Sequence, residues 1–96
     1  MERQEVQLQI QLDEDVAQGM YANMAMVNHG EGEFVFDFIF VQPQQPKAKV
    51  RARIITSAKH AKRFLLALQD NIGKFEQRFG AIDLSAPAGS EPGSLN

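Results

Sequence analysis

Every second residue from Phe34 to Phe40 is a phenylalanine, within a run that extends from Glu33 to Val41. Successive side chains of a β-strand point to opposite faces, so this run places all four phenyl rings on one face. Aromatic side chains stabilise a fold mainly when they are removed from water, so such a face requires a cover. The run therefore predicts a strand over residues 33–41 with a covered phenylalanine face.

A long amphipathic helix is predicted directly after the basic part of the chain. Ser57 is a suitable N-cap, and Gly80 is a suitable stop about twenty-two residues later. Between them, apolar side chains recur at helical spacing and form one stripe: Ala61, Phe64, Leu65, Leu68, Ile72, Phe75 and Phe79. We expect this helix to cover the phenylalanine face.

Three further strands are predicted. Val6–Leu12 alternates aliphatic residues with glutamines, and residues 20–29 are apolar on both faces. Lys47–Thr56 alternates basic with apolar residues. A capped helical turn over residues 13–19 separates the first two strands. A glycine turn at residues 29–32 and a proline-containing connection at residues 42–46 separate the others.

Together these elements predict an α+β fold, a four-stranded antiparallel β-meander packed on one long C-terminal α-helix. The domain is expected to cover residues 1–80, followed by a flexible tail over residues 81–96 that is rich in serine, glycine and proline. An apolar content of 44% and a charged content of 23% are typical of a soluble globular domain.

The absence of cysteine excludes a disulfide framework and a cysteine-ligated metal site. The polar start of the chain resembles no signal peptide, and no apolar run approaches the roughly 20 residues that span a bilayer. We therefore expect a cytoplasmic protein.

The charge is strongly polarised along the chain. Residues 1–42 contain eight acids and one base, whereas residues 43–80 contain nine bases and two acids. Such a chain either pairs its halves within one fold or presents a basic surface to an acidic partner. The candidate contacts for an anion or a nucleic acid are Lys47, Lys49, Arg51, Arg53, Ser57, Lys59, His60, Lys62 and Arg63.

Internal pairing is the competing interpretation of the basic strand. If residues 42–46 form the loop, position 41 faces position 47, and Asp37 then faces Arg51. Such cross-strand pairs would neutralise part of the basic row and leave a solvated face. The bases at the start of the helix lie where the macrodipole disfavours cations, which favours an anion there instead.

One helix covers only one face of the sheet. The other face is expected to combine the basic row with an apolar patch of Tyr21, Ala25, Val27, Val35, Ile39 and Val41. Monomers rarely expose a patch of that size, so we expect it to be buried in a homodimer or a larger assembly. The alternative is that loops and the tail shield it.

Catalytic and metal-binding motifs are nearly absent, so we expect no enzyme, no metal and no cofactor. His29 and His60 lack the spacing of paired metal ligands. The acidic run that begins at Asp13 lacks the glycine and glutamate of a calcium loop, because Gln18 and Met24 stand at those positions.

Three stretches in this order are characteristic of one family: Gly19-Met20-Tyr21-Ala22-Asn23, Glu33-Phe34-Val35-Phe36-Asp37-Phe38, and Ser57–Phe64 continuing to Phe75-Glu76-Gln77-Arg78-Phe79-Gly80. The chain resembles the small bacterial and archaeal proteins called domain of unknown function 3467. That resemblance implies a fold but no activity, cofactor or functional residue.

The order of elements also resembles that of the SecB-type export chaperones, which follow a four-stranded antiparallel sheet with a long helix. From these observations we expect a non-enzymatic protein-binding or adaptor module that acts as a homo-oligomer through its sheet face or edge. The alternative is an anion or nucleic-acid binding protein that uses the basic strand and the helix N-terminus.

Overall fold

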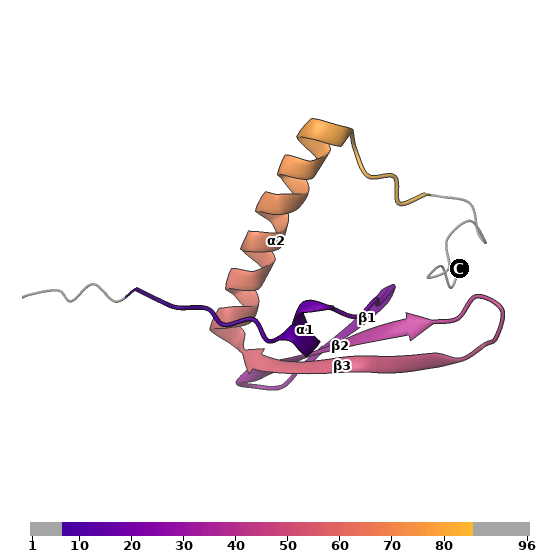
Figure 1. Ribbon diagram of the computed structural model, residues 1–96, viewed down its shortest axis with the longest axis horizontal. Coiled ribbons are helices and arrows are strands. Elements are labelled where there is room, and N and C mark those ends of the chain that lie inside the picture. The colour runs from indigo at the N-terminus through magenta and orange to yellow at the C-terminus, as the bar shows by residue number, and fades with distance from the viewer. Residues whose placement is uncertain (1–6, 86–96) are drawn as a thin grey trace, which may run out of the picture.

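The computed structural model describes residues 7–85, which form three strands and two helices (Figure 1). In chain order these elements are α1 (Glu14–Ala17), β1 (Met24–His29), β2 (Glu33–Val41), β3 (Ala48–Ser57) and α2 (Ala58–Phe79). The strands form one antiparallel sheet in the order β1-β2-β3. The α+β class, the antiparallel sheet and the C-terminal helix are confirmed, but the described sheet has three strands, whereas four were predicted.

The missing strand is the first one. Residues 7–13, called the N-terminal arm below, are extended but form no strand, and Val6 lies outside the described residues. In Figure 1 the arm runs away from the sheet, in the direction opposite to the β2–β3 hairpin. Its apolar side chains are exposed: Leu8 by 83%, Ile10 by 89% and Leu12 by 67%. Alternation predicts which side chains share a face, but it does not supply a neighbouring strand.

The chain joins the sheet at Asn23. Its backbone N–H donates to the carbonyl oxygen of Ile39 at 3.0 Å. Its side chain then brackets Val41, accepting from the backbone N–H at 2.8 Å and donating to the carbonyl oxygen at 3.1 Å. This clamp fixes the start of β1 at Met24, four residues after the predicted start at residue 20.

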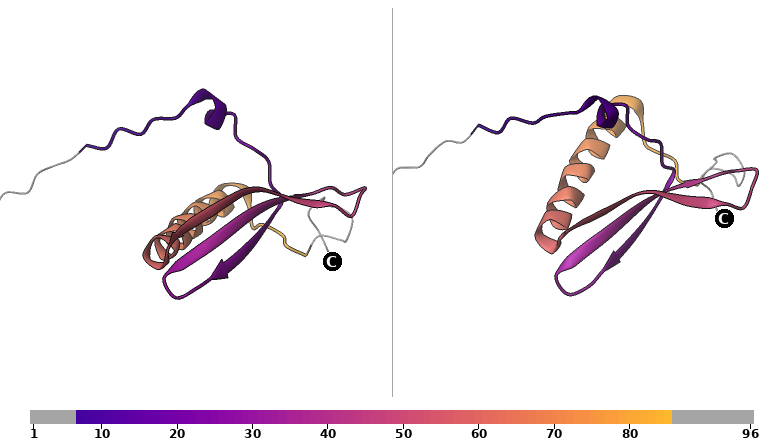
Figure 2. Two further views of the ribbon diagram at one scale, coloured as in Figure 1. Left: turned by 90° about the horizontal axis from the view of Figure 1, so that it is seen from below. Right: turned by 60° about the horizontal axis from the view of Figure 1, so that its bottom comes forward.

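The short α1 connects the arm to this clamp. Asp13 is its N-cap position as predicted, and Gly19 takes a φ of 72° just after its end, a conformation that favours glycine. In Figure 2, left, the arm and α1 lie clear of the strands, and α1 packs against none of the other described elements.

The register of β1 against β2 decides which side chains share a face. Val27 lies opposite Phe36, and Ala25 lies opposite Phe38, so both belong to the phenylalanine face. Val35 and its neighbours at odd positions of β2 point to the opposite face. The predicted apolar patch is therefore divided between the two faces, because the turn after β1 pairs odd positions of one strand with even positions of the other.

The buried residues of the sheet lie on the face opposite to the phenylalanines. Ile39 is 4% exposed and Val41 is 6% exposed, whereas the four phenylalanines of β2 are half-buried. Met24 of β1 and Val50 of β3 are the cross-strand partners of Ile39, so the side chain of Ile39 lies between theirs on the same face of the sheet. The C-terminal half of the middle strand thus forms the small core of the sheet.

The helix α2 begins and ends as predicted. The hydroxyl of Ser57 accepts from the backbone N–H of His60 at 3.2 Å, and Gly80 takes a φ of 98° at the other end. Only the first turns reach the sheet, where the rings of Phe64 and Phe36 lie 5.6 Å apart, and the rest of α2 rises away from it (Figure 1). The prediction that α2 covers the phenylalanine face is correct only for that end, and Ala61 is the sole buried residue of α2.

The predicted tail begins as described residues 81–85, which form no helix or strand, and its remainder lies outside the described residues. The backbone N–H of Ile82 donates to the carboxylate of Glu76 at 2.9 Å, so the chain folds back against the last turn of α2.

Candidate binding surfaces

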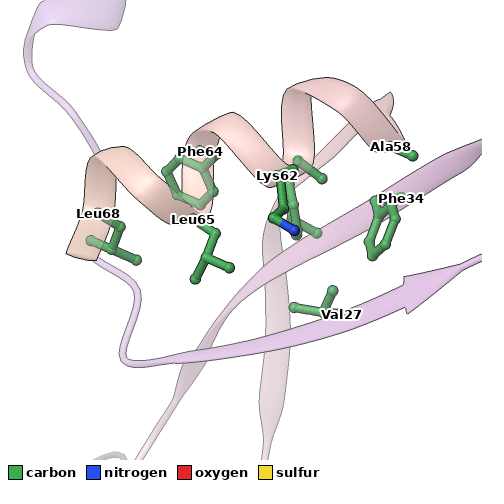
Figure 3. A pocket seen from close by; sticks show the side chains of 9 residues that line it. Val27, Phe34, Ala58, Lys62, Phe64, Leu65 and Leu68 are labelled. Atoms are coloured by element: carbon green, nitrogen blue, oxygen red, sulfur yellow. The ribbon is translucent and has the colours of Figure 1, made fainter. Parts of the chain in front are cut away.

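An apolar groove lies between the start of α2 and the sheet (Figure 3). Its volume is about 430 Å³. Figure 3 shows Val27 of β1 and Phe34 of β2 on the sheet side, and Leu65 and Leu68 on the helix side. Apart from one lysine, its lining is wholly apolar: Val27, Phe34, Phe36, Ala58, Ala61, Lys62, Phe64, Leu65 and Leu68. A ligand that fits this groove must present apolar side chains.

The stripe of α2 continues from the groove into solvent. Beyond the first turns its side chains are exposed by 44% at Leu68, 39% at Ile72, 49% at Phe75 and 66% at Phe79. The ring centres of Phe75 and Phe79 lie 5.0 Å apart with the rings tilted by 45°, and the guanidinium of Arg78 lies 5.2 Å from the Phe79 ring centre. Groove and stripe together form one apolar surface along α2, which we call the helix surface.

A second apolar hollow lies between the first turns of α2 and the strands β2 and β3. It has a volume of about 270 Å³ and is lined by Phe36, Phe38, Ile54, Thr56, His60 and Phe64. Phe36 and Phe64 therefore separate two hollows, one toward β1 and one toward β3.

The six residues of the predicted apolar patch are not brought together. Ile39 and Val41 are buried within this chain, while Tyr21 is 66% exposed beside Phe40, with ring centres 6.1 Å apart. Of the six, only Val27 lines the groove, and it is 55% exposed. Within the described helices and strands, the exposed large apolar side chains thus lie mainly on α2, with further ones on β1 and β3.

One ion pair is built into the sheet. The carboxylate of Asp37, whose side chain is 9% exposed, accepts from Nε of Arg53 at 2.7 Å and from its Nη2 at 3.0 Å. This bidentate hydrogen bond lowers the pKa of Asp37 and raises the pKa of Arg53. The pair locks β2 to β3 at the centre of the sheet.

The predicted partner of Asp37 was Arg51, and that register is wrong. Val41 faces Ala48, one residue later than predicted, and the ladder shifts by one further residue between Phe38 and Ile39, so that Asp37 faces Arg53. Arg51 is the extra residue of this irregularity. The basic residues alternate without a break in the sequence and so did not indicate the shift, which places Lys49 on the face of Phe40 and Arg53 on the face of Asp37.

The candidate cationic residues are divided into separate groups. Lys47, Lys49 and Arg51 line a polar pocket of about 480 Å³ near the β2–β3 turn, together with Phe40, Gln42 and Ala48. Lys59, Lys62 and Arg63 follow the other end of β3. Along the strand, Lys49 and Ser57 are about 26 Å apart at 3.3 Å per residue. Ser57 caps α2, His60 lines the hollow toward β3, and Arg53 is paired. A single small anion does not contact both groups.

Residues 7–85 contain neither a metal-binding cluster nor a membrane-spanning helix. No three histidine, aspartate or glutamate side chains of that range gather in a way that would hold a metal ion. Its helices all fall short of the combined length and apolar character that a bilayer crossing requires.

The sequence did not predict that most of the apolar stripe of α2 is exposed, or that the N-terminal arm pairs with no strand of the described sheet. The stripe itself is plain in the sequence, but nothing local specifies the angle at which a helix leaves the strand before it. The arm showed the pattern of a strand, and the sheet to which a strand adds is not encoded in its own residues.

Comparison with known proteins agrees with the three sequence stretches noted above. The family described as Protein of unknown function (DUF3467) matches residues 1–84, which include every described helix and strand. No curated protein and no solved structure matches the chain significantly. The chain belongs to the DUF3467 family.

Proposed function

We propose that this protein is a non-enzymatic protein-binding or adaptor module that acts as a homo-oligomer through the helix surface and the adjoining sheet edge. The observation that supports this proposal most directly is the bare apolar stripe of α2. Its last three turns rise away from the sheet, although Ile72, Phe75 and Phe79 continue the side on which Leu68 lines the groove.

The balance of burial supports the same proposal. Among the described residues, only Ile39, Val41 and Ala61 are buried apolar residues, while twenty large apolar side chains are exposed. A domain of this size is marginal even with a full core, because small domains bury a low fraction of their surface. Covering the stripe with a second copy would add on the order of 1 kcal/mol for each half-exposed side chain.

The test is the mass of the protein in solution, measured by light scattering over a range of concentrations. Phe75→Glu places a charge on the stripe, and Gln77→Glu places the same charge on the opposite side of α2. We expect the wild type and Gln77→Glu to exceed the chain mass of 10.7 kDa and Phe75→Glu to approach it. A wild type that keeps the mass of a single chain at every concentration would contradict the proposal.

The second candidate function is anion or nucleic-acid binding at the end of the β2–β3 hairpin. It is supported by the polar pocket that Lys47, Lys49 and Arg51 line, with no acidic side chain among the lining residues. Binding of labelled DNA and RNA, titrated at low and then at physiological salt, tests it, because phosphate contacts weaken steeply with salt.

Two charge reversals locate such binding. Lys49→Glu changes the pocket, and Lys59→Glu makes the same change at the start of α2. A site in the pocket predicts at least tenfold weaker binding for Lys49→Glu and a much smaller effect for Lys59→Glu. Absence of binding by the wild type at low salt would exclude this candidate.

A further inference from the structure

We propose that the N-terminal arm of one copy pairs with the free edge of β1 in a second copy, so that each sheet gains a fourth strand from its partner. The inference rests on the proposed function, since it requires two copies. It goes further by naming the segment that is exchanged, the edge that receives it and the groove that its side chains fill.

The arm has the pattern of a half-buried strand but no strand beside it. Leu8, Ile10 and Leu12 alternate with three glutamines, and all three aliphatic side chains are about two-thirds exposed or more, at 83%, 89% and 67%. Within the described residues, the backbone of residues 7–12 makes no hydrogen bond to the sheet. Its extended backbone and its apolar side both lack a partner.

The two edges of the sheet differ in their protection. The edge strand β3 contains Lys49, Arg51 and Arg53, and charged side chains of this kind discourage the addition of a further strand. The edge strand β1 has the sequence Met-Ala-Met-Val-Asn-His, with no lysine, arginine or acid. The arm from residue 7 to residue 12 is also uncharged, so the unprotected edge of β1 is the one that suits it.

The edge of β1 also opens onto the apolar groove. Val27 lies on β1 and lines the groove, and the neighbouring position for an added strand is about 4.8 Å further out. Leu8 to Leu12 spans about 13 Å at 3.3 Å per residue. Ala58 to Leu68, the helix residues along the groove, span about 15 Å at 1.5 Å per residue. Three aliphatic side chains of the arm therefore match the groove in length.

A second copy is favoured over the same chain as the source of this strand. The clamp at Asn23 fixes the point where the chain enters the sheet, and from there α1 and the arm lead away from it (Figures 1 and 2). The arm projects free of its own sheet, in the position from which it can reach another. Reciprocal exchange between two copies gives a closed, symmetric dimer.

The first test compares two aspartates at adjacent positions. Ile10→Asp introduces a charge among the apolar side chains of the arm, whereas Gln9→Asp introduces it on the other side. We expect Ile10→Asp to weaken dimer formation about 100-fold in sedimentation equilibrium and Gln9→Asp to change it little. Equal effects of the two substitutions would overturn the proposal.

The second test uses the absence of cysteine from the chain. Gln9→Cys in one copy and Met26→Cys in a size-tagged second copy would lie on the same side of the paired strands, within disulfide distance. Ile55→Cys is the matched control, because Ile55 lies on the same sheet face but on β3. We expect oxidation of the mixed copies to link Gln9→Cys to Met26→Cys and not to Ile55→Cys.

The outcomes separate this inference from the proposed function. A disulfide to Ile55→Cys, or a disulfide within one chain that contains both Gln9→Cys and Met26→Cys at high dilution, would overturn the exchange onto β1. An Ile10→Asp variant that dimerises like the wild type would also overturn it while leaving the homo-oligomer in place. A wild type that is monomeric at every concentration would contradict both.

Discussion

At the scale of single residues, Asp37 is the only buried charged residue among those that the structure describes. It is a carboxylate on the same face as Ile39 and Val41, and its residue is only 6% exposed. A charge in that position requires a hydrogen-bonded partner, and Arg53 supplies it across the strands. The sequence predicted a cross-strand pair for Asp37 but not its partner, because the register shift at Phe38 depends on how the two strands coil together.

The ion pair makes stability depend on pH in a defined direction. Arg53 holds the pKa of Asp37 below its ordinary value of 3.8 in the folded protein, so the unfolded chain takes up this proton first as the pH falls. The stabilisation is therefore present above about pH 4 and is lost as the pH falls through the lower, folded pKa. We expect Asp37→Asn to lower the melting temperature at pH 7 and to flatten its dependence on pH below 4.

Thermal unfolding followed by circular dichroism from pH 2.5 to pH 7 measures this dependence. Asp70→Asn is the control, because Asp70 pairs with Lys74 on the exposed surface of α2, where a pair contributes little. If Asp37→Asn kept the acid sensitivity of the wild type, the carboxylate of Asp37 would not be its source.

The small core predicts a contrast between two isoleucines. Ile39 is 4% exposed and Ile55 is 59% exposed. Removing one methylene group at Ile39 should lower the free energy of unfolding by about 1 kcal/mol, while Ile55→Val should change it by less than about 0.5 kcal/mol. Urea unfolding of the two valine variants checks this. Equal losses would mean that Ile55 is also buried, as it would be if another chain covered β3.

At the scale of elements, local signals were sufficient where an element depends on its own residues. The strand at residues 33–41 and the helix at residues 58–79 are found as predicted, because alternation, the Ser57 cap and the Gly80 stop act within each segment. The strand predicted at residues 47–56 is found one residue later. The predictions of a strand at residues 6–12 and of a start of β1 at residue 20 were wrong, because strand formation there depends on pairing with a neighbour.

The glycine inside α2 and the glycine at its end are expected to respond in opposite directions to the same change. Gly80 takes a φ of 98° and a ψ of 164°, a conformation that side chains rarely adopt, so Gly80→Ala should cost about 1–3 kcal/mol. Gly73 lies inside α2, and a Cβ added there would meet open space, so Gly73→Ala should stabilise by about 1 kcal/mol. Urea unfolding compares the two. A destabilising Gly73→Ala would indicate that another chain packs against that side of α2.

At the scale of the whole molecule, three parts of the described chain lack a neighbour within it. Its sheet has an uncharged edge at β1, its arm has the pattern of a strand without a neighbour, and its long helix leaves the sheet after its first turns. The second copy that we propose, which contributes an arm and covers the helix surface, would account for each of these features. The predicted four-stranded sheet would then be restored by two chains instead of one.

The central claim is that two copies complete one another, and the mass in solution tests it most directly. Light scattering on the wild type, Ile10→Asp and Gln9→Asp at matched concentrations should give twice the chain mass of 10.7 kDa for the wild type and for Gln9→Asp. Ile10→Asp should give a mass close to that of a single chain at the same concentrations. A wild type with the mass of one chain throughout would contradict the claim.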